Sequence, residues 1–151
     1  EMEPLDIVEE TRAVFANWVA AFERNGISYD FISDMDEIQT SMDRVFYERI
    51  VNNLLKNVME HSGASKIWIE IVQTGVTVVV KICDNGVGIP EKAIPFVFDR
   101  LYKVDDARSS KGSGLGLAIV RELVLMQGGK IFVEPRKKGS CFVMEFPILE
   151  N

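Results

Sequence analysis

The run Val76-Thr77-Val78-Val79-Val80-Lys81-Ile82-Cys83 leads directly into Asp84-Asn85-Gly86-Val87-Gly88. The length and the β-branched residues of the first run predict a largely buried strand. Asp84 therefore lies where that strand ends. Gly86 and Gly88 permit positive φ angles and close approach of a ligand to the backbone. The pattern predicts a carboxylate beside a tight turn at the end of a buried strand.

A carboxylate at this place could accept a hydrogen bond from the exocyclic amine of adenine. The alternative is an ordinary Asp-Asn-Gly turn within a hairpin. A hairpin would resume a strand after Gly86, whereas Gly88-Ile89-Pro90-Glu91 is typical of the approach to a helix. The pattern therefore favours a binding loop, with candidate contacts from Asp84, Gly86, Gly88 and Ile89.

Before this strand, apolar residues at spacings of three and four predict a helix with Asp43 as its N-cap: Val51, Leu54, Leu55 and Val58. Residues four apart share a helix face, so a polar stripe lies beside the apolar one: Asn53, Asn57 and, one turn further, Glu60 and His61. Mg²⁺ prefers oxygen ligands and keeps several waters, so an amide carbonyl beside nucleotide phosphates would suit it. A solvated helix flank is the alternative interpretation.

A third cluster, Gly112-Ser113-Gly114-Leu115-Gly116, opens the run 115–127, whose apolar face and following Gly128 predict a helix with a C-terminal stop. Glycines at a helix N-terminus leave backbone N–H groups free to hold a phosphate, aided by the helix dipole. The spacing excludes two familiar phosphate motifs. A P-loop requires Lys-Ser or Lys-Thr where this chain has Leu117-Ala118, and a dinucleotide fingerprint would follow a strand, not the charged loop 105–113.

Taken in order, these clusters resemble the catalytic ATP-binding domain of a bacterial sensor histidine kinase over nearly the whole chain. Residues 53–58 resemble the asparagine box of that family, 84–88 its first glycine box and 112–117 its second. Residues 97–105 resemble its phenylalanine box, and segments 128–131 and 139–142 its closing strands. The resemblance implies the Bergerat ATP-binding fold, an α/β (α+β) two-layer sandwich with a mixed sheet and helices packed on one face.

By resemblance, Asn57 would ligate Mg²⁺, Asn53 would support the metal and the phosphates, and Asp84 would bind the adenine amine. Tyr102 and Lys103 would close over the nucleotide as part of an ATP lid at about residues 99–113, a segment without periodicity. The phosphates would be lined by Gly112, Ser113, Gly114, Leu115, Gly116 and Leu117.

Three residues depart from the family pattern. Glu60 stands where the family often carries Lys, so one phosphate contact is missing and a like charge is brought near the phosphates. His61 stands where an aromatic ring is common, and its own ring could pack on the adenine or the ribose. Leu101 replaces the second Phe of the phenylalanine box, which predicts a looser anchor for the lid.

The reaction implied by the resemblance is transfer of the γ-phosphoryl group of Mg-ATP to a histidine in two-component signal transduction. His61 is the only histidine, and it lacks the surroundings of the family's phosphoacceptor. The acceptor is therefore expected on dimerisation helices of a parent protein, which would precede Pro4-Leu5-Asp6. That parent could be membrane-anchored, with a response regulator downstream. Residues 1–151 are expected to form one cytoplasmic domain that is monomeric by itself.

Three alternatives remain. An ATPase of the gyrase, chaperone and mismatch-repair type shares the pocket but carries Glu in place of Asn53, and an amide cannot activate water as that carboxylate does. A module that binds ATP only as a switch, or has lost it, is disfavoured by Asn57, Asp84 and the glycines. An anti-sigma serine kinase fits the phenylalanine box less well.

Composition agrees with one soluble domain, because 151 residues can bury a substantial core. A formal net charge of −6 argues against nucleic acid or an anionic membrane surface as the main partner. No apolar run approaches the roughly twenty residues of a membrane span. Cys83 and Cys141 lack metal-type spacing and lie on predicted strands, which predicts buried thiols in a reducing compartment.

The predicted order begins with a helix from about Pro4 to Arg24 and a strand near Ile27–Ile32, followed by the helix of Asn53 and Asn57. A hairpin of residues 66–72 and 76–84 comes next, then the lid region, the glycine helix and a final hairpin. Strands and helices arranged in this way predict two layers, with the helices on one face of the sheet.

Overall fold

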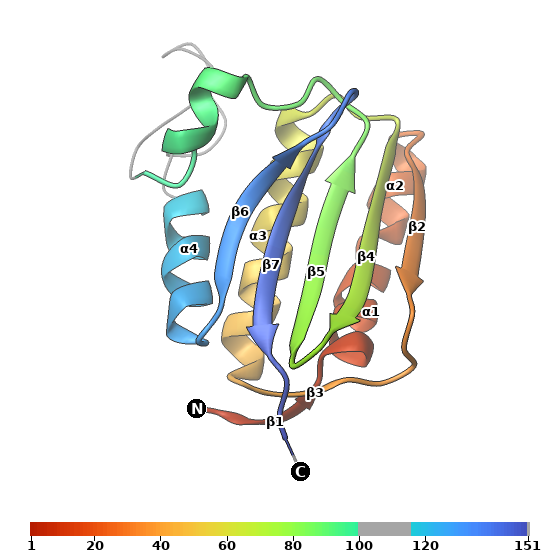
Figure 1. The fold of residues 1–151 in the computed structure, drawn as a ribbon. Helices are drawn as coiled ribbons and strands as arrows, with labels where there is room; N and C mark the ends of the chain where they lie inside the picture. Colours follow the sequence, from red (N-terminus) through yellow and green to blue (C-terminus); the bar gives the residue numbers. More distant parts are fainter. Residues whose placement is uncertain (100–115, 151) are drawn as a thin grey trace.

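The computed structural model describes residues 1–99 and 116–150, and its centre is a five-stranded mixed sheet with the strand order β2-β4-β5-β7-β6 (Figure 1). The strands are β2 (Ser28–Ser33), β4 (Lys66–Thr74), β5 (Thr77–Asp84), β6 (Lys130–Pro135) and β7 (Ser140–Pro147). β2 pairs with β4 in parallel, and the other neighbouring strands of this sheet pair antiparallel. A small second sheet joins β1 (Glu3–Asp6) to β3 (Gln39–Met42).

The described α-helices lie on one face of the large sheet (Figure 1). They are α1 (Ile7–Ala16), α2 (Val19–Arg24), α3 (Arg44–His61) and α4 (Gly116–Met126), and a 3₁₀ helix, η1 (Glu91–Phe96), follows β5. The predicted two-layer α/β sandwich with a mixed sheet is therefore confirmed. The opposite face of the sheet, turned toward the viewer in Figure 1, carries none of the described helices, and we call it the open face.

Side-chain alternation along the central strands separates the two faces of the sheet. Val78, Val80 and Ile82 of β5 are fully buried in the main core, together with Leu54 and Leu55 of α3. Fully burying each such side chain contributes about 1.5 to 3 kcal/mol. The core thus holds α3 directly against the middle of the sheet, which sets the position of the C-terminal ends of α3 and β5.

The helix α3 begins where the sequence predicts. The carboxylate of Asp43 accepts a hydrogen bond from the Phe46 N–H at 3.0 Å, as an N-cap does. The backbone N–H of Asp43 donates to Gln127 Oε1 at 2.9 Å, which ties the start of α3 to the end of α4. The two helices are therefore joined at the end of the molecule opposite the predicted nucleotide site.

The N-terminal segment differs from the single helix predicted over Pro4–Arg24. Residues Glu3–Asp6 pair with β3, and the helical part divides into α1 and α2 at Asn17 and Trp18. Asp6 ends the strand because its carboxylate accepts from the Val8 N–H at 3.1 Å and so caps α1. The helices α1 and α2 and the residues between them turn one apolar face to the core: Val8, Phe15, Trp18 and Phe22. A shared apolar face explains why the helical period did not reveal the break.

Cys83 and Cys141 form a disulfide, so the prediction of free thiols is wrong. Their predicted burial is confirmed, because both residues are 0% exposed. The two cysteines are 58 residues apart in the chain, yet the register of β5 and β7 places Cys83 opposite Cys141. The pairing follows from strand register, which the spacing of cysteines in a sequence does not reveal.

Glu10 of α1 gives the fold a pH dependence that can be measured. It is buried and ion-paired with Arg44 of α3. Burial is the main cause that raises the pKa of Glu10 to about 7, a hydrogen bond with Glu48 adds to this, and Arg44 opposes it. Because the folded pKa lies above the unfolded value of 4.5, the stability that Glu10 contributes is fully present below pH 4.5 and is lost as the pH rises toward 7.

We therefore expect Glu10→Gln to raise the free energy of unfolding at pH 8 by about 1 to 2 kcal/mol over the unsubstituted chain. At pH 4 the two proteins should differ little, because Glu10 is then protonated in both the folded and the unfolded state. Urea unfolding at the two pH values checks this. Equal effects of Glu10→Gln at pH 4 and pH 8 would contradict the proposed role of its ionisation.

Candidate nucleotide-binding site

The end of α3 and the end of β5 lie together at one end of the sandwich, drawn at the top of Figure 1, and α4 begins lower, beside α3. α3 and α4 pack against each other and run in opposite directions, so the C-terminal half of one lies beside the first turn of the other. The described residues of the predicted site come from three segments: Asn53, Asn57 and His61 from the C-terminal half of α3, the loop Asp84–Ile89 after β5, and Gly116 and Leu117 from the first turn of α4.

Asp84 is a buried carboxylate at the end of β5, with 3% of its surface exposed. It lies on the same face of the strand as Ile82, toward the helices. Its Oδ1 accepts a hydrogen bond from the Gly86 N–H at 2.8 Å. Burial raises the pKa of Asp84 above its usual value, and the bond from Gly86 opposes that rise. A carboxylate kept from water in this way is suited to accept a hydrogen bond from a ligand donor.

The two glycines of the loop are required for different reasons. Gly88 has a φ of 74°, as the sequence predicts for a tight turn. Gly86 does not have a positive φ, and it is needed for close approach instead: a Cβ there would lie 2.1 Å from the backbone oxygen of Ser62. The Val87 N–H donates to the same Ser62 oxygen at 2.8 Å. The loop after β5 is therefore packed directly on the C-terminal end of α3.

Asn85 supports this loop, although the sequence motif alone did not assign it a role. Its Oδ1 accepts from the backbone N–H groups of Ser65 and Lys66, each at 2.9 Å, and its Nδ2 donates to Ser65 Oγ at 2.9 Å. An Asn between Asp84 and Gly86 is itself the signal that could have been used, because Asn side chains commonly bond nearby backbone groups in turns. Asn85 thus fastens the loop to the start of β4.

The polar stripe of α3 is present as predicted. Asn53 and Asn57 are partly exposed on one face of the helix, and Glu60 and His61 follow at its end. His61 Nε2 lies 3.9 Å from Glu60 Oε1, so two of the three residues that depart from the family pattern are neighbours. Asn52, one position before Asn53, faces elsewhere and accepts a hydrogen bond from Trp18 Nε1 at 2.8 Å. The stripe is therefore distinct from the part of α3 that contacts the first helices.

The helix α4 begins beside α3, with Gly116 exposed and Leu117 partly buried against the core. Nothing lies within 4 Å of a Cβ built on Gly116. The remaining predicted residues of the lid and the second glycine box fall outside the described residues: Leu101, Tyr102, Lys103, Gly112, Ser113, Gly114 and Leu115. The described part of the predicted phosphate end therefore consists of residues of α3 and of the first turn of α4.

The chain before residue 100 is anchored by Phe98. This residue is 9% exposed, and its ring meets that of Phe142 edge-on, with the centroids 6.2 Å apart. The 3₁₀ helix η1 precedes it, in agreement with the helical segment predicted after Ile89-Pro90. Of the segment that resembles the phenylalanine box, residues 97–99 are described, and Val97 and Phe98 are part of the core.

The chain belongs to the family of histidine kinase-, DNA gyrase B- and HSP90-like ATPases, whose model matches residues 42–150. The described part of the chain contains no helix long and apolar enough to cross a membrane.

Relatives within this family are sensor histidine kinases. Sensor histidine kinase YvrG of Bacillus subtilis is 37% identical over 128 residues, which cover 81% of this chain and 22% of that protein. Sensor histidine kinase CusS of Escherichia coli O157:H7 is 33% identical over 150 residues, which cover 97% of this chain and 31% of that protein. The chain thus spans about a fifth to a third of the length of these curated relatives.

Solved structures of the same class have the same fold. The nucleotide-free catalytic domain of histidine kinase ThkA superposes with a TM-score of 0.87 at 28% identity, covering 97% of this chain and 95% of that chain. ThkA in complex with the response regulator TrrA has a TM-score of 0.84 at 25% identity, covering 98% of this chain and 42% of that chain. The chain therefore corresponds to the catalytic, ATP-binding part of such kinases.

Proposed function

We propose that residues 1–151 form one histidine kinase catalytic domain that binds Mg-ATP and donates its γ-phosphoryl group to a histidine on separate dimerisation and phosphoacceptor helices. The observation that supports this proposal is that α3, which carries Asn53 and Asn57, packs against α4 and is bonded at its end to the loop that follows buried Asp84. Each supplies a different group that a nucleotide requires.

The residues present suit Mg-ATP. The buried carboxylate of Asp84 would accept the exocyclic amine of adenine, and Gly86, Gly88 and Ile89 would form the wall beside it. His61, exposed at the end of α3, could pack its ring on the adenine or the ribose. The amide oxygen of Asn57 would hold Mg²⁺ together with phosphate oxygens, with Asn53 supporting it. When bound, Mg²⁺ supplies positive charge that neutralises the phosphate oxygens.

This chain would contribute to phosphoryl transfer mainly by positioning. Such transfers depend on orientation and on electrostatic stabilisation, and the base belongs to the acceptor. The backbone N–H groups at the start of α4 would face the phosphates, aided by the positive end of the helix dipole. Residues 112–117 would line the phosphates, and Tyr102 and Lys103 would close over the nucleotide.

The ATPase alternative differs at one residue. Asn53 has an amide where the hydrolytic members of the family would need a carboxylate to activate water, so this domain should hydrolyse ATP very slowly. A steady-state assay of phosphate release by the purified chain tests this expectation. Fast turnover would favour a hydrolytic ATPase over a phosphotransferase.

Replacement of Asn57 tests the metal site. Calorimetric titration with the ATP analogue AMPPNP should show adenine-selective binding that strengthens with Mg²⁺ and is absent with a GTP analogue. We expect Asn57→Ala to weaken Mg²⁺-dependent binding about tenfold, because it removes one oxygen ligand, and to leave binding without Mg²⁺ nearly unchanged. Asn52→Ala, one residue away on another face of α3, is the matched control. Equal losses of Mg²⁺-dependent affinity in the two variants would show that Asn57 is not a metal ligand.

The wider setting follows from the relatives. A kinase that resembles ThkA, which is known in complex with a response regulator, would pass its phosphoryl group to such a regulator. ATP is available inside the cell, so the domain would work in the cytoplasm, in a parent that could itself be membrane-anchored. The dimer contacts would lie in the phosphoacceptor helices, and the chain alone would be a monomer.

A further inference from the structure

The disulfide lies on the open face of the sheet. Cys83 and Cys141 alternate with the core residues Ile82 and Phe142, so their sulfur atoms point away from the described helices. Both cysteines are nevertheless 0% exposed. Trp68 packs against them, and the Arg136 Nη1 lies 3.7 Å from Cys141 Sγ. Among the described residues, side chains shield this bond from solvent, whereas helices cover the other face.

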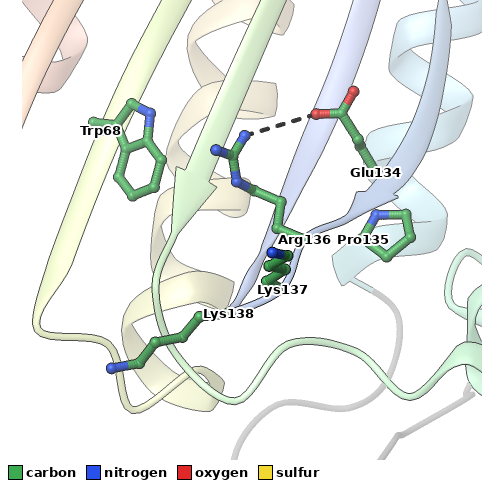
Figure 2. Close-up of a pocket in the computed structure, with 6 residues that line it drawn as sticks. All are labelled: Trp68, Glu134, Pro135, Arg136, Lys137 and Lys138. Atoms are coloured by element: carbon green, nitrogen blue, oxygen red, sulfur yellow. Dashed lines mark ion pairs between the residues drawn. The ribbon is translucent and has the colours of Figure 1, made fainter.

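A surface hollow of about 510 Å³ shares Trp68 and Arg136 with the surroundings of the disulfide. It is lined by Trp68, Glu134, Pro135, Arg136, Lys137 and Lys138 (Figure 2). Figure 2 shows the guanidinium of Arg136 between Trp68 and Glu134. Its central carbon lies 5.6 Å from the centroid of the Trp68 ring, and its Nη1 lies 3.9 Å from Glu134 Oε1. Glu134 is also paired with Lys81 at 3.2 Å. The lining of the hollow thus carries three cations and one carboxylate that is already paired, and the hollow favours a small anion in an otherwise acidic protein.

The disulfide is not needed to hold a chain of this size together. The main core between the sheet and the helices is extensive, and chains of this length bury enough apolar surface without a cross-link. If the domain binds ATP as proposed above, it works in a compartment where thiols are kept reduced and where disulfides are usually transient. In that compartment, a disulfide that is shielded only by side chains, and that no described helix covers, is suited to reversible exchange.

We propose that Cys83 and Cys141 form a reversible thiol–disulfide site, that the cationic hollow receives a small carboxylate-bearing thiol, and that the oxidised form holds the nucleotide loop in its binding geometry. The last part rests on the proposed function. Side chains of Arg136 and Trp68 must move to admit the thiol, because they pack against the two cysteines.

The exchange balances without any further reactant. The incoming thiolate attacks Cys83 Sγ, the bond to Cys141 Sγ breaks, and Cys141 leaves with the electron pair. The guanidinium of Arg136 stabilises the negative charge on that sulfur. A second thiolate then attacks the external sulfur of the mixed disulfide and releases Cys83. Two external thiols are oxidised to one disulfide, and the protein disulfide is reduced by two electrons to a dithiol.

The redox site is coupled to the nucleotide loop through the backbone. Cys83 directly precedes Asp84, and the next pair of the ladder joins Asp84 to Ser140. Gly139 lies so close to this pair that a Cβ on it would be 1.9 Å from the Asp84 backbone oxygen. Two thiol sulfur atoms need more room than two bonded ones, so reduction loosens the last pair of β5 and β7 before the loop. The dithiol form should therefore hold Asp84 less firmly.

The first test measures the exchange itself. The oxidised chain is treated with glutathione, which is anionic, with neutral 2-mercaptoethanol and with cationic cysteamine at equal thiolate concentrations. Alkylation and mass spectrometry then count the free thiols. At low salt we expect glutathione to react about tenfold faster than cysteamine, and the double variant Lys137→Gln, Lys138→Gln to lose most of that preference. Failure of all three thiols to reduce the native protein, or a preference unchanged in the variant, would overturn the site.

The second test measures coupling. Binding of AMPPNP with Mg²⁺ to the oxidised and the glutathione-reduced chain is compared by calorimetry, with circular dichroism to confirm that both are folded. We expect the dithiol form to bind about fivefold more weakly. The double variant Cys83→Ser, Cys141→Ser should bind equally before and after glutathione. Equal affinity of the two wild-type forms would overturn the coupling, whereas no binding to either form would overturn the proposed function and leave the exchange rates to decide the redox site.

Discussion

Asp84→Asn is expected to weaken binding of an adenine nucleotide by about 1 to 3 kcal/mol, or roughly 5- to 150-fold, without loss of fold. The Gly86 N–H already donates to one oxygen of Asp84. An amide can keep that bond only by turning its NH₂ group to the place of the other oxygen. Two donors, the amide and the adenine amine, would then face each other in a buried site. Calorimetric titration with AMPPNP measures the loss.

The stability of the same variant separates a binding role from a structural one. Burial raises the folded pKa of Asp84 above its unfolded value, so the protein loses stability as the pH rises through that window and the carboxylate ionises. An amide at this position does not ionise. We therefore expect Asp84→Asn to melt at the same or a higher temperature at pH 7. A lower melting temperature together with weaker binding would show that Asp84 acts through the fold.

A matched control is available for the charge. Asp36→Asn removes one negative charge from an exposed position in the connection between β2 and β3, at the other end of the molecule. It should leave nucleotide affinity unchanged. If both variants weaken binding to the same extent, net charge and not the contact with adenine is responsible.

Gly139→Ala is expected to lower the free energy of unfolding by about 2 to 5 kcal/mol. Gly139 has a φ of 86°, which an L residue adopts at a cost of about 1 to 2 kcal/mol. A Cβ there would also lie 1.9 Å from the backbone oxygen of Asp84 and 2.8 Å from Cα of Asn85. Both contacts are with backbone atoms, so the clash cannot be relieved by a rotamer change. The end of the β5–β7 pair must move, and with it the nucleotide loop.

Gly75→Ala measures the dihedral strain without the clash. Gly75 lies in the turn between β4 and β5 with a φ of 61°, and nothing lies within 4 Å of a Cβ built on it. This variant should lose about 1 to 2 kcal/mol from strain alone. Urea unfolding of the two variants measures the difference. Losses of the same size would mean that the approach of Gly139 to Asp84 does not contribute.

Several parts of the site could be placed from local patterns. The spacing of Asn53 and Asn57 put them on one helix face, and the β-branched run ending at Cys83 put Asp84 at the end of a strand; both placements are confirmed. The contacts of these residues with a nucleotide stay predictions. Asn85 and Ser62 were not assigned a role, because their part is to bond backbone groups of segments that are distant in the sequence.

Short-range periodicity by itself determined the two layers of this protein, the N-cap of α3 and the ends of the central strands, because each depends on residues within one or two turns or along one strand. Tertiary structure alone decided the break between α1 and α2, the pairing of Cys83 with Cys141 and the close approach of Gly139 to Asp84. These features depend on strand register and on contacts between segments far apart in the chain. A local pattern carries no information about which distant segment will lie beside it, so only the assembled sheet could place the disulfide next to the nucleotide loop.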